Sequence, residues 1–386
     1  MSWLVVDAEE LMVRRNGSID PAKFPNETFE LHSIPAFDAG SPAIVTGAHI
    51  GSSKQLVAPS DVMISKIVPH IRRSSVVGES TGHRQIASGE WIVFRSNLFF
   101  PQFLRHYLIS DEFHAQFMGT VSGVGGSLLR ARPAEVAKIK IPLPPLPEQR
   151  RIATILDKAD ALRTQRRAAI AKLDEFLQSV FLDMFGDPVT NPKGWPIRRI
   201  SDLLESVKYG SSAKASLEGE VPILRMNNLT YSGEMDLTDL KYITANQAEE
   251  KYLVHPGDIL FNRTNSKELV GKTAVYEGPA PMAYAGYLVR GRVLQGHVPE
   301  YISAFLNSKW GKAILRNMCK NIVGMANINA KEFGSIELPV PPSHLQARFQ
   351  RSCHAIREQK RTLQHHATRL DTLFASLKHR AFTGGL

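Results

Sequence analysis

Cysteine is almost absent from this sequence of 386 residues, which contains only Cys319 and Cys353. Two cysteines exclude a disulfide framework and a cysteine-rich zinc site, and such scarcity is typical of a reducing compartment. The sequence also lacks a run of about 18 apolar residues and an apolar signal segment after Met1. We therefore expect a cytoplasmic protein without a membrane partner.

The chain is also poor in acidic residues relative to basic ones. It has 37 Asp and Glu against 47 Lys and Arg, which gives a formal net charge of +10. This excess favours a polyanionic partner, either nucleic acid or an anionic membrane surface. The long helices predicted below lack the Trp- or Phe-rich face that interfacial helices place opposite Lys and Arg. The charge therefore favours nucleic acid.

Motifs that catalysis requires are missing or incomplete. The triplet GKT at 271–273 resembles the end of a phosphate-binding loop, but Ser266 stands where that loop needs its first glycine. The Asn-Pro-Pro-aromatic turn of adenine methyltransferases is absent, because the Asn-Pro pair at 191–192 is followed by lysine and glycine. We therefore expect no catalytic residue, no metal and no cofactor in this chain.

Two further patterns leave an alternative open. Carboxylate-x-lysine triplets, which metal-dependent nucleases use, occur at 239–241, 249–251 and 358–360, but matches of three residues are common by chance. Four histidines lie on the last predicted helix without a carboxylate at ligand spacing, and we expect them on its solvated faces; they are His354, His365, His366 and His379. The alternative is a stand-alone metal-dependent nuclease, or a non-catalytic scaffold whose basic surface is incidental.

Much of the sequence occurs twice, with an offset of about 197 residues. The box IPLPPLPEQRRI at 141–152 returns as LPVPPSHLQARF at 338–349, and KQLVAPSDVMISK at 54–66 returns as KYLVHPGDILFNR at 251–263. This period is far longer than the roughly 20–50 residues of solenoid repeats, so the repeated element is a whole domain with a helix. We expect a pseudo-two-fold molecule.

Each copy predicts a globular domain followed by a long helix. Short strand-like runs, broken by Gly, Pro and Ser, precede a helical segment in each half, which is typical of the α+β class rather than of a doubly wound sheet. Proline boxes end the globular parts, and the segment FGDPVTNPKGWP stops the first helix. The predicted divisions are a globular domain at 1–145, a helix at 146–186, a globular domain at 187–342 and a helix at 343–386.

Both predicted helices carry an apolar stripe with a period near seven, which one helix alone cannot bury. Pairing them as an antiparallel coiled coil buries both stripes, and docking of each stripe on its own domain is the alternative. Arg166 and Lys360 interrupt the stripes, and we expect them to extend to water. The residues expected to pack between the helices are Ile152, Ala159, Leu162, Leu173, Phe176, Val180, Phe349, Ile356, Leu363, Leu370 and Leu377.

Sequence readout in a DNA groove uses Arg or Lys for guanine and Asn or Gln for adenine, with further cations on phosphates. Lys66 and Arg263 occupy matched positions after strand-like runs, which favours equivalent backbone contacts. The Gly-rich loops at 121–132 and 321–331 are also matched and would read bases, although ordinary loops look similar. The candidate DNA-binding residues are Lys54, Lys66, Arg72, Arg73, Arg84, Arg130, Arg132, Lys251, Asn262, Arg263, Asn265, Lys267, Lys272, Asn327 and Asn329.

Three segments resemble the specificity subunit of type I restriction-modification systems: the PLPPLPEQ box before a long helix, the MFGDP and NPKGWP linker, and GDILFNRTNSKELVGKTAVYEG at 257–278. The resemblance covers essentially the whole chain. It implies two target recognition domains that each read one half of a bipartite double-stranded DNA site, separated by two antiparallel helices. The second copy departs from the box at 343–345, where it has Ser, His and Leu, and this puts its helix start in doubt.

The resemblance also implies that the chain is a non-catalytic subunit. Its helices would set the spacing between half-sites and dock methyltransferase subunits, of which two are expected. Adenine methylation would be performed by those subunits and DNA cleavage by restriction subunits. S-adenosylmethionine, ATP and Mg²⁺ would accordingly bind only in the partner subunits.

Overall fold

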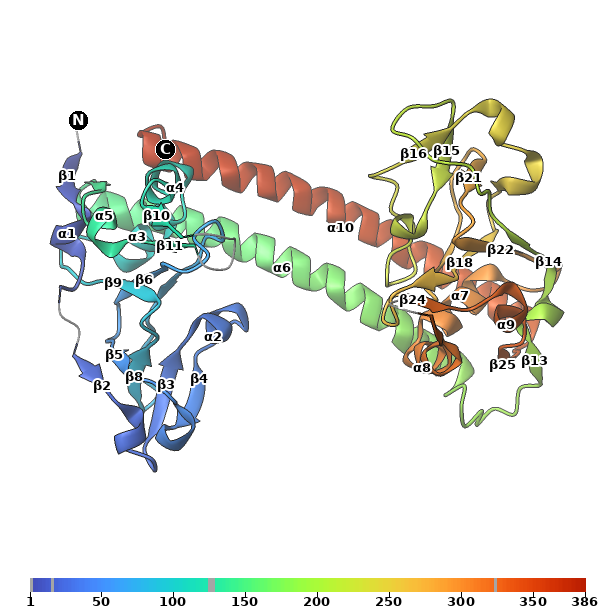
Figure 1. Cartoon of the computed structure of the whole chain (residues 1–386), viewed down its shortest axis with the longest axis horizontal. Helices are drawn as coiled ribbons and strands as arrows, with labels where there is room; N and C mark the ends of the chain where they lie inside the picture. Colours follow the sequence, from blue (N-terminus) through green and yellow to red (C-terminus); the bar gives the residue numbers. More distant parts are fainter. Residues whose placement is uncertain (1–2, 15–16, 124–128, 323–324) are drawn as a thin grey trace. The chain divides into compact units, whose positions relative to one another are not determined.

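The computed structural model describes residues 3–14, 17–123, 129–322 and 325–386, and the chain divides into two compact units. Unit 1 comprises Met1–Arg166 and His366–Leu386, and unit 2 comprises Arg167–His365. Each unit therefore contains a globular part and one portion of each of two long helices, drawn in green and red in Figure 1. Within the described ranges, no helix is long and apolar enough to cross a membrane.

The globular part of unit 1 combines small sheets with short helices. Its strands are β1 (Leu4–Asp7), β2 (Ser18–Ile19), β3 (Thr28–His32), β4 (Ala43–Thr46), β5 (Lys54–Leu56), β6 (Val62–Ser65), β7 (Ser74–Val76), β8 (Arg84–Ala87), β9 (Trp91–Phe94), β10 (Val121–Ser122), β11 (Arg130–Ala131) and β12 (Lys140–Leu143), and its helices are α1 (Ala8–Leu11), α2 (Ile34–Asp38), α3 (Pro101–Leu108), α4 (Asp111–Met118) and α5 (Pro133–Val136). One sheet has the order β2-β5-β8-β3-β4 and another the order β7-β6-β9. Strands β6 and β9 are buried along their whole length, which explains their nearly continuous apolar sequences.

The globular part of unit 2 has the same mixed character. Its strands are β13 (Ile197–Arg199), β14 (Leu204–Tyr209), β15 (Val221–Leu224), β16 (Lys241–Ile243), β17 (Leu253–Val254), β18 (Ile259–Asn262), β19 (Thr264–Asn265), β20 (Thr273–Val275), β21 (Met282–Tyr284), β22 (Leu288–Val293), β23 (Lys320–Ile322), β24 (Met325–Asn327) and β25 (Glu337–Pro339), and its helices are α7 (Pro299–Asn307), α8 (Lys309–Met318) and α9 (Ala330–Gly334). The sheets have the orders β14-β22-β18-β20, β16-β15-β21-β17 and β19-β24-β23. The α+β class predicted from the sequence is confirmed.

The repeat in the sequence corresponds to equivalent elements in the two units. Strand β1 pairs antiparallel with β12, and β13 pairs antiparallel with β25. In each unit, the first strand of the globular part therefore lies beside the strand that leads into a long helix. These helices are α6 (Leu146–Phe185) and α10 (Ser343–Thr383). Each ends just before a glycine with φ of +80°, Gly186 or Gly384, a conformation that glycine adopts without strain.

A buried glutamine fixes the start of each long helix. Gln149 Oε1 accepts a hydrogen bond from the Phe100 amide at 2.7 Å, and its Nε2 donates to the carbonyl of the box proline five residues earlier at 2.8 Å. Gln346 repeats both bonds, with the Val298 amide at 3.1 Å and its own box proline at 2.7 Å. Because Phe100 and Val298 directly precede α3 and α7, each glutamine joins the box, the long helix and a short helix of the globular part.

Within each unit, the two long helices run antiparallel and pack on the globular part. In unit 1, Ile152 near the start of α6 is buried in one core with Phe374 and Phe382 near the end of α10. In unit 2, Phe181 near the end of α6 lies 5.7 Å from Phe349 near the start of α10, measured between ring centroids. Both packing modes considered from the sequence, helix on helix and helix on its own domain, therefore occur together.

The apolar stripe is interrupted between these cores. Leu162 and Phe176 are 53% and 55% exposed, so the prediction that they pack between the helices is wrong. The other stripe residues are buried or half-buried; these are Ile152, Phe349, Ile356, Ala159, Leu173, Val180, Leu363, Leu370 and Leu377. The period of the stripe identifies a face, but it does not show whether apolar or charged partners cover that face.

Ion pairs join the two long helices instead. In unit 1, Arg163 Nε lies 2.6 Å from Asp371 Oδ1, and in unit 2, Lys360 Nζ lies 2.7 Å from Asp174 Oδ1. Lys360 is buried and also lies 2.9 Å from Glu234 Oε1, so the expectation that it extends to water is wrong. Two carboxylates hold this lysine at the helix interface.

Candidate nucleic-acid interface

Arg263 follows β18 and lies at the centre of a polar cluster in unit 2. Its Nη2 donates to Asn327 Oδ1 at 3.3 Å, and its Nη1 donates to Gly286 O at 3.4 Å. Its guanidinium carbon lies 5.1 Å from the centroid of the Tyr209 ring. Asn327 Nδ2 in turn donates to Thr264 Oγ1 at 3.2 Å. Separate strands thus hold a guanidinium, an amide and an aromatic ring together.

This cluster has the chemistry that reads DNA bases. Arg263 and Asn327 are both half-buried, so each keeps part of its side chain accessible. A guanidinium recognises guanine and a carboxamide recognises adenine, each through two hydrogen bonds. Tyr209 is 45% exposed and offers a face on which a base can stack.

Lys66 lies at the equivalent place in unit 1. Its carbonyl accepts a hydrogen bond from the Ala131 amide at 2.8 Å, just as the Arg263 carbonyl accepts one from the Ile328 amide at 2.9 Å. The match that the repeat predicts between Lys66 and Arg263 is therefore a structural equivalence.

The two units differ at the next position of this site. Arg130 pairs with Ile67 across strands, as Asn327 pairs with Thr264. Arg130 is 44% exposed, and its Nε and Nη2 each donate to the Glu90 carboxylate at 3.3 Å. The same backbone therefore presents an amide in unit 2 and a carboxylate-paired guanidinium in unit 1, two groups that pair with different base edges.

Several predicted cations are already engaged. Besides Arg130, carboxylates hold four of them, in the pairs Arg72–Asp111, Arg73–Asp38, Arg84–Glu27 and Lys251–Glu249. Lys54 Nζ donates to Ser52 O at 2.7 Å, and Arg132 Nε donates to Thr120 O at 3.3 Å. A paired cation must give up its carboxylate before it can bind a phosphate, so these four residues and Arg130 rank below Lys66 and Arg263 as candidate phosphate contacts.

Burial removes two predicted residues from the interface. Asn262 is fully buried, and Lys272 is 7% exposed with its Nζ donating to Met226 O at 2.6 Å. The predictions for both are wrong, because the positions flanking an apolar run do not reveal which side chains point inward. Asn329 serves as the N-cap of α9, where its Oδ1 accepts from the Glu332 amide at 2.9 Å.

The remaining candidates lie near the surface. Lys267 is exposed, and Asn265 is half-buried with its Oδ1 accepting from the Ser266 amide at 2.8 Å. In the two Gly-rich loops, residues 124–128 and 323–324 lie outside the described residues.

A repeated ion pair between a buried aspartate and an arginine was missed from the sequence. Asp61 Oδ1 accepts from Arg95 Nε at 2.5 Å, and Asp258 Oδ1 accepts from Arg292 Nε at 2.9 Å. Both aspartates are buried, and the hydrogen bond raises the pKa of each arginine. Each pair joins the start of β6 or β18 to the neighbouring strand β9 or β22, and Lys66 and Arg263 directly follow the other ends of β6 and β18. A signal was present, since aspartate recurs in APSDVM and HPGDIL.

Tyr209 was also missed, and nothing in the sequence marks it. Its segment has no recognisable counterpart in the first copy. Its hydroxyl accepts a hydrogen bond from the Ala330 amide at 2.9 Å, which fixes the ring beside Arg263.

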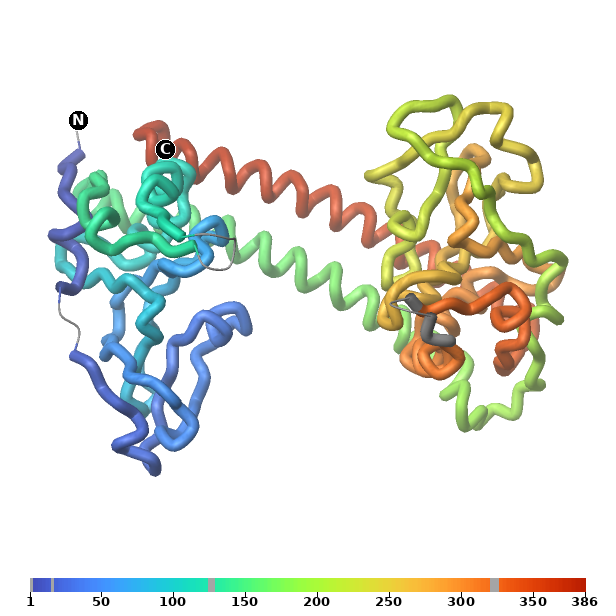
Figure 2. Tube along the Cα trace, in the orientation of Figure 1, coloured from blue at the N-terminus to red at the C-terminus, as the bar shows by residue number. Residues whose placement is uncertain are grey.

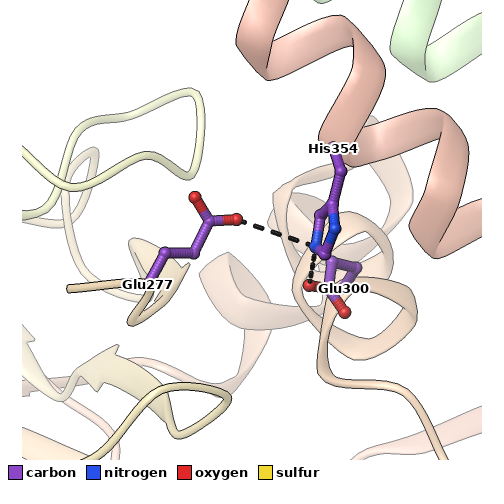
Figure 3. A group of neighbouring side chains, drawn as sticks. All are labelled: Glu277, Glu300 and His354. Carbon is purple, nitrogen blue, oxygen red and sulfur yellow. Dashed lines mark hydrogen bonds and ion pairs between the residues drawn. The ribbon is translucent and has the colours of Figure 1, made fainter. Parts of the chain in front are cut away.

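One side-chain cluster in unit 2 has the composition of a metal site. Ligand atoms of Glu277, Glu300 and His354 lie within 4.8 Å of one another (Figure 3). His354 Nε2 lies 2.9 Å from Glu300 Oε1, so long-range contacts supply the carboxylate that its helix lacks. Arg357 contacts both carboxylates, and Arg361 contacts Glu277. Two guanidinium groups already balance the two carboxylates, which makes the cluster an ion-pair network rather than a place for a further cation.

Comparison with known proteins gives the same family for both copies of the repeat. The family model described as "Type I restriction modification DNA specificity domain" matches residues 75–172 and 192–352. The type I restriction enzyme EcoKI specificity subunit of Escherichia coli (strain K12) is 25% identical over 358 residues, which cover 86% of this chain and 76% of that protein. The StySPI specificity subunit of Salmonella potsdam is 24% identical over 356 residues, with the same coverage.

Solved structures share the fold. The S subunit of a type I restriction-modification system from M. genitalium aligns with a TM-score of 0.62 at 12% identity and covers 98% of this chain and 96% of that one. A chain from a structure of type I restriction-modification complex assembly aligns with a TM-score of 0.60 at 21% identity and covers 100% and 98%.

Proposed function

Because the chain belongs to the family of type I restriction-modification DNA specificity subunits, we propose that its two globular parts are target recognition domains, each binding one half of a bipartite double-stranded DNA site. The single observation that carries the proposal is the family match in both copies of the repeat. Such subunits recognise DNA and leave catalysis to other subunits. A stand-alone nuclease or an incidental scaffold is therefore not favoured.

In this proposal, equivalent strand ends meet the major groove in both domains. Arg263 and Asn327 read base edges in one half-site, while Lys66 and Arg130 hold the equivalent place in the other. The overall basic charge supplies phosphate contacts that position the domains and make binding salt-dependent. Different groups at equivalent positions give the two half-sites different sequences.

The chemistry belongs to the partners. Two methyltransferase subunits dock on the long helices and methylate one adenine in each half-site, and restriction subunits cleave DNA. S-adenosylmethionine, ATP and Mg²⁺ bind in those subunits, and none is bound by this chain. An adenine must leave the base stack to reach a methyltransferase, so we expect the DNA to be distorted on binding. The complex acts in the cytoplasm.

The test is to co-express the chain with the methyltransferase subunit of its system in a host without other DNA modification. Methylated adenines are then mapped across the genome. A split motif with one methylated adenine in each half is the expected result. Methylation at a continuous short site, or none from a well-folded complex, would contradict the proposal.

A further inference from the structure

The ion pairs between the two long helices have the same polarity in both units. Arg163 and Lys360 occupy the same place in the repeat, and so do Asp174 and Asp371. The pair Arg163–Asp371 in unit 1 is therefore the counterpart of Lys360–Asp174 in unit 2. On this helix-to-helix face, the duplication has kept the position and the sign of each charge.

On the face that each helix turns to its own globular part, the signs of the charges differ between the two units. In unit 1, α6 carries Asp157 and Asp160 on this face. In the globular part, His106 lies 2.7 Å from Asp157, and Arg105 lies 3.6 Å from both aspartates. The acid is on the helix, and the base is on the domain.

In unit 2 the signs are exchanged. The places of Asp157 and Asp160 in the repeat are taken by His354 and Arg357 of α10. The globular part provides Glu300, which lies 2.9 Å from His354 (Figure 3), and Glu277, which contacts Arg357. Here the base is on the helix, and the acid is on the domain.

One domain-side group in each unit, His106 or Glu300, is buried, so a partner of the wrong polarity at that group is costly. The His106 side chain is 0% exposed and offers a donor, whereas Glu300 is 3% exposed and offers only acceptors when ionised. A buried carboxylate that faces another carboxylate loses its partner and gains a repulsion. The surrounding architecture is otherwise shared, since the glutamine contacts and the long-helix aromatic packing recur in both units.

We propose that these helix faces select their domain by charge. The acidic face of α6 accepts only a globular domain with a basic docking side, and the basic face of α10 accepts only one with an acidic docking side. Exchange of the domains would place Glu300 against Asp157 and Glu277 against Asp160. The reverse exchange would place Arg105 against Arg357. The charges thus restrict which domain can be joined to which helix, and they do not depend on which DNA sequence either domain reads.

The test uses two full-length proteins and one pair of substitutions. The first protein is the natural chain, and the second is a chimera in which residues 187–342 also replace residues 1–145. Asp157→His with Asp160→Arg gives α6 the side chains that α10 has at the equivalent positions. We expect these substitutions to lower the melting temperature of the natural chain by roughly 3–6 °C and to raise that of the chimera by a similar amount. The chimera with the substitutions and the chimera without them have the same packing mismatches. The difference between their melting temperatures therefore reports the effect of the charges.

Two controls separate polarity from the loss of an interaction. Glu175→Arg adds positive charge at an exposed position of α6, and we expect it to change neither protein by more than about 1 °C. Asp157→Asn with Asp160→Asn removes the charges from the natural chain, and we expect a smaller loss than reversal gives. If the paired substitutions shift both proteins in the same direction, the proposal is overturned. If the chimera does not fold in either form, the natural chain decides: reversal no worse than neutralisation overturns the proposal, and reversal clearly worse supports it.

Discussion

At the scale of single residues, Lys66 and Arg263 differ in chemistry at equivalent positions, and we expect them to make different contacts with DNA. Lys66 is a flexible point charge, whereas Arg263 is held in place by Asn327 and Tyr209. A point charge suits a phosphate, and a fixed planar guanidinium suits a base edge.

Replacement of Lys66 by alanine tests this assignment. In the complex with its methyltransferase, we expect Lys66→Ala to weaken binding to target and non-target DNA about equally, and to lower the salt dependence by about one counterion. Fluorescence anisotropy over a range of salt concentrations measures both. Lys251→Ala, which removes a lysine already paired with Glu249, is the matched control and should have a smaller effect. Loss of affinity for the target alone would show that Lys66 reads a base.

Lys312 gives a prediction about pH. It is 5% exposed, and its Nζ donates to Gly271 O at 3.3 Å and to Asn307 Oδ1 at 3.1 Å. Burial, together with nearby Lys272, lowers its pKa to about 8. The unfolded chain keeps a lysine pKa near 10.4 and therefore binds more protons between these values, so the Lys312 contribution to stability rises with pH through this window.

The comparison of the natural chain with Lys312→Met isolates this effect. We expect the difference in free energy of unfolding to move in favour of the natural chain by about 2–3 kcal/mol between pH 7.5 and pH 10.5. Urea unfolding at several pH values measures it. A difference that stays constant with pH would mean that Lys312 titrates normally in the folded protein.

At the scale of elements, we expect the glutamine at the start of each long helix to contribute strongly to stability, because its side chain satisfies buried backbone groups. Gln149→Ala leaves the Phe100 amide and a proline carbonyl buried without partners, and we expect it to cost about 2–4 kcal/mol of stability. Gln116→Ala, an exposed glutamine on α4, should change stability by less than about 0.5 kcal/mol. Urea unfolding of the full chain compares them, and equal effects would show that the buried contacts contribute little.

The long helices illustrate what sequence can and cannot predict. Their existence follows from local signals, namely the proline boxes, the heptad period and the terminal glycines. Their partners do not, because Leu162 and Phe176 fit the stripe yet are exposed, while Lys360 interrupts the stripe yet is buried. The carboxylates that hold Lys360 and His354 come from distant segments, and periodicity carries no information about such contacts.

The candidate interface shows the same contrast between features that the sequence predicts and features that depend on distant contacts. The repeat correctly matched Lys66 with Arg263, because register is preserved in a duplication. Asn262 and Lys272 were misassigned, since their orientation depends on strands and helices far along the chain. Tyr209 comes from a segment without a counterpart and could be found only once β14 was placed beside β22.

At the scale of the whole molecule, the length of the long helices should set the spacing of the two half-sites. Insertion of one heptad between Ile155 and Leu177, with a matching insertion in α10, adds about 10 Å while keeping the phase of the stripe. We expect the spacer in the methylated motif to lengthen by about two to three base pairs. Methylome sequencing of the co-expressed complex measures this, and an unchanged spacer would contradict it. Substitution of seven exposed residues without insertion is the control.

Both end segments of the chain belong to unit 1 (Figure 2). Leu4 pairs with Leu143 just before α6, and the Leu386 carbonyl accepts a hydrogen bond from Arg151 just after α6 begins. Unit 2 has the same arrangement of strand and helix, but there the peptide chain is continuous through the segment after Phe185. A strand pair and a hydrogen bond in unit 1 therefore take the place that a covalent linker takes in unit 2.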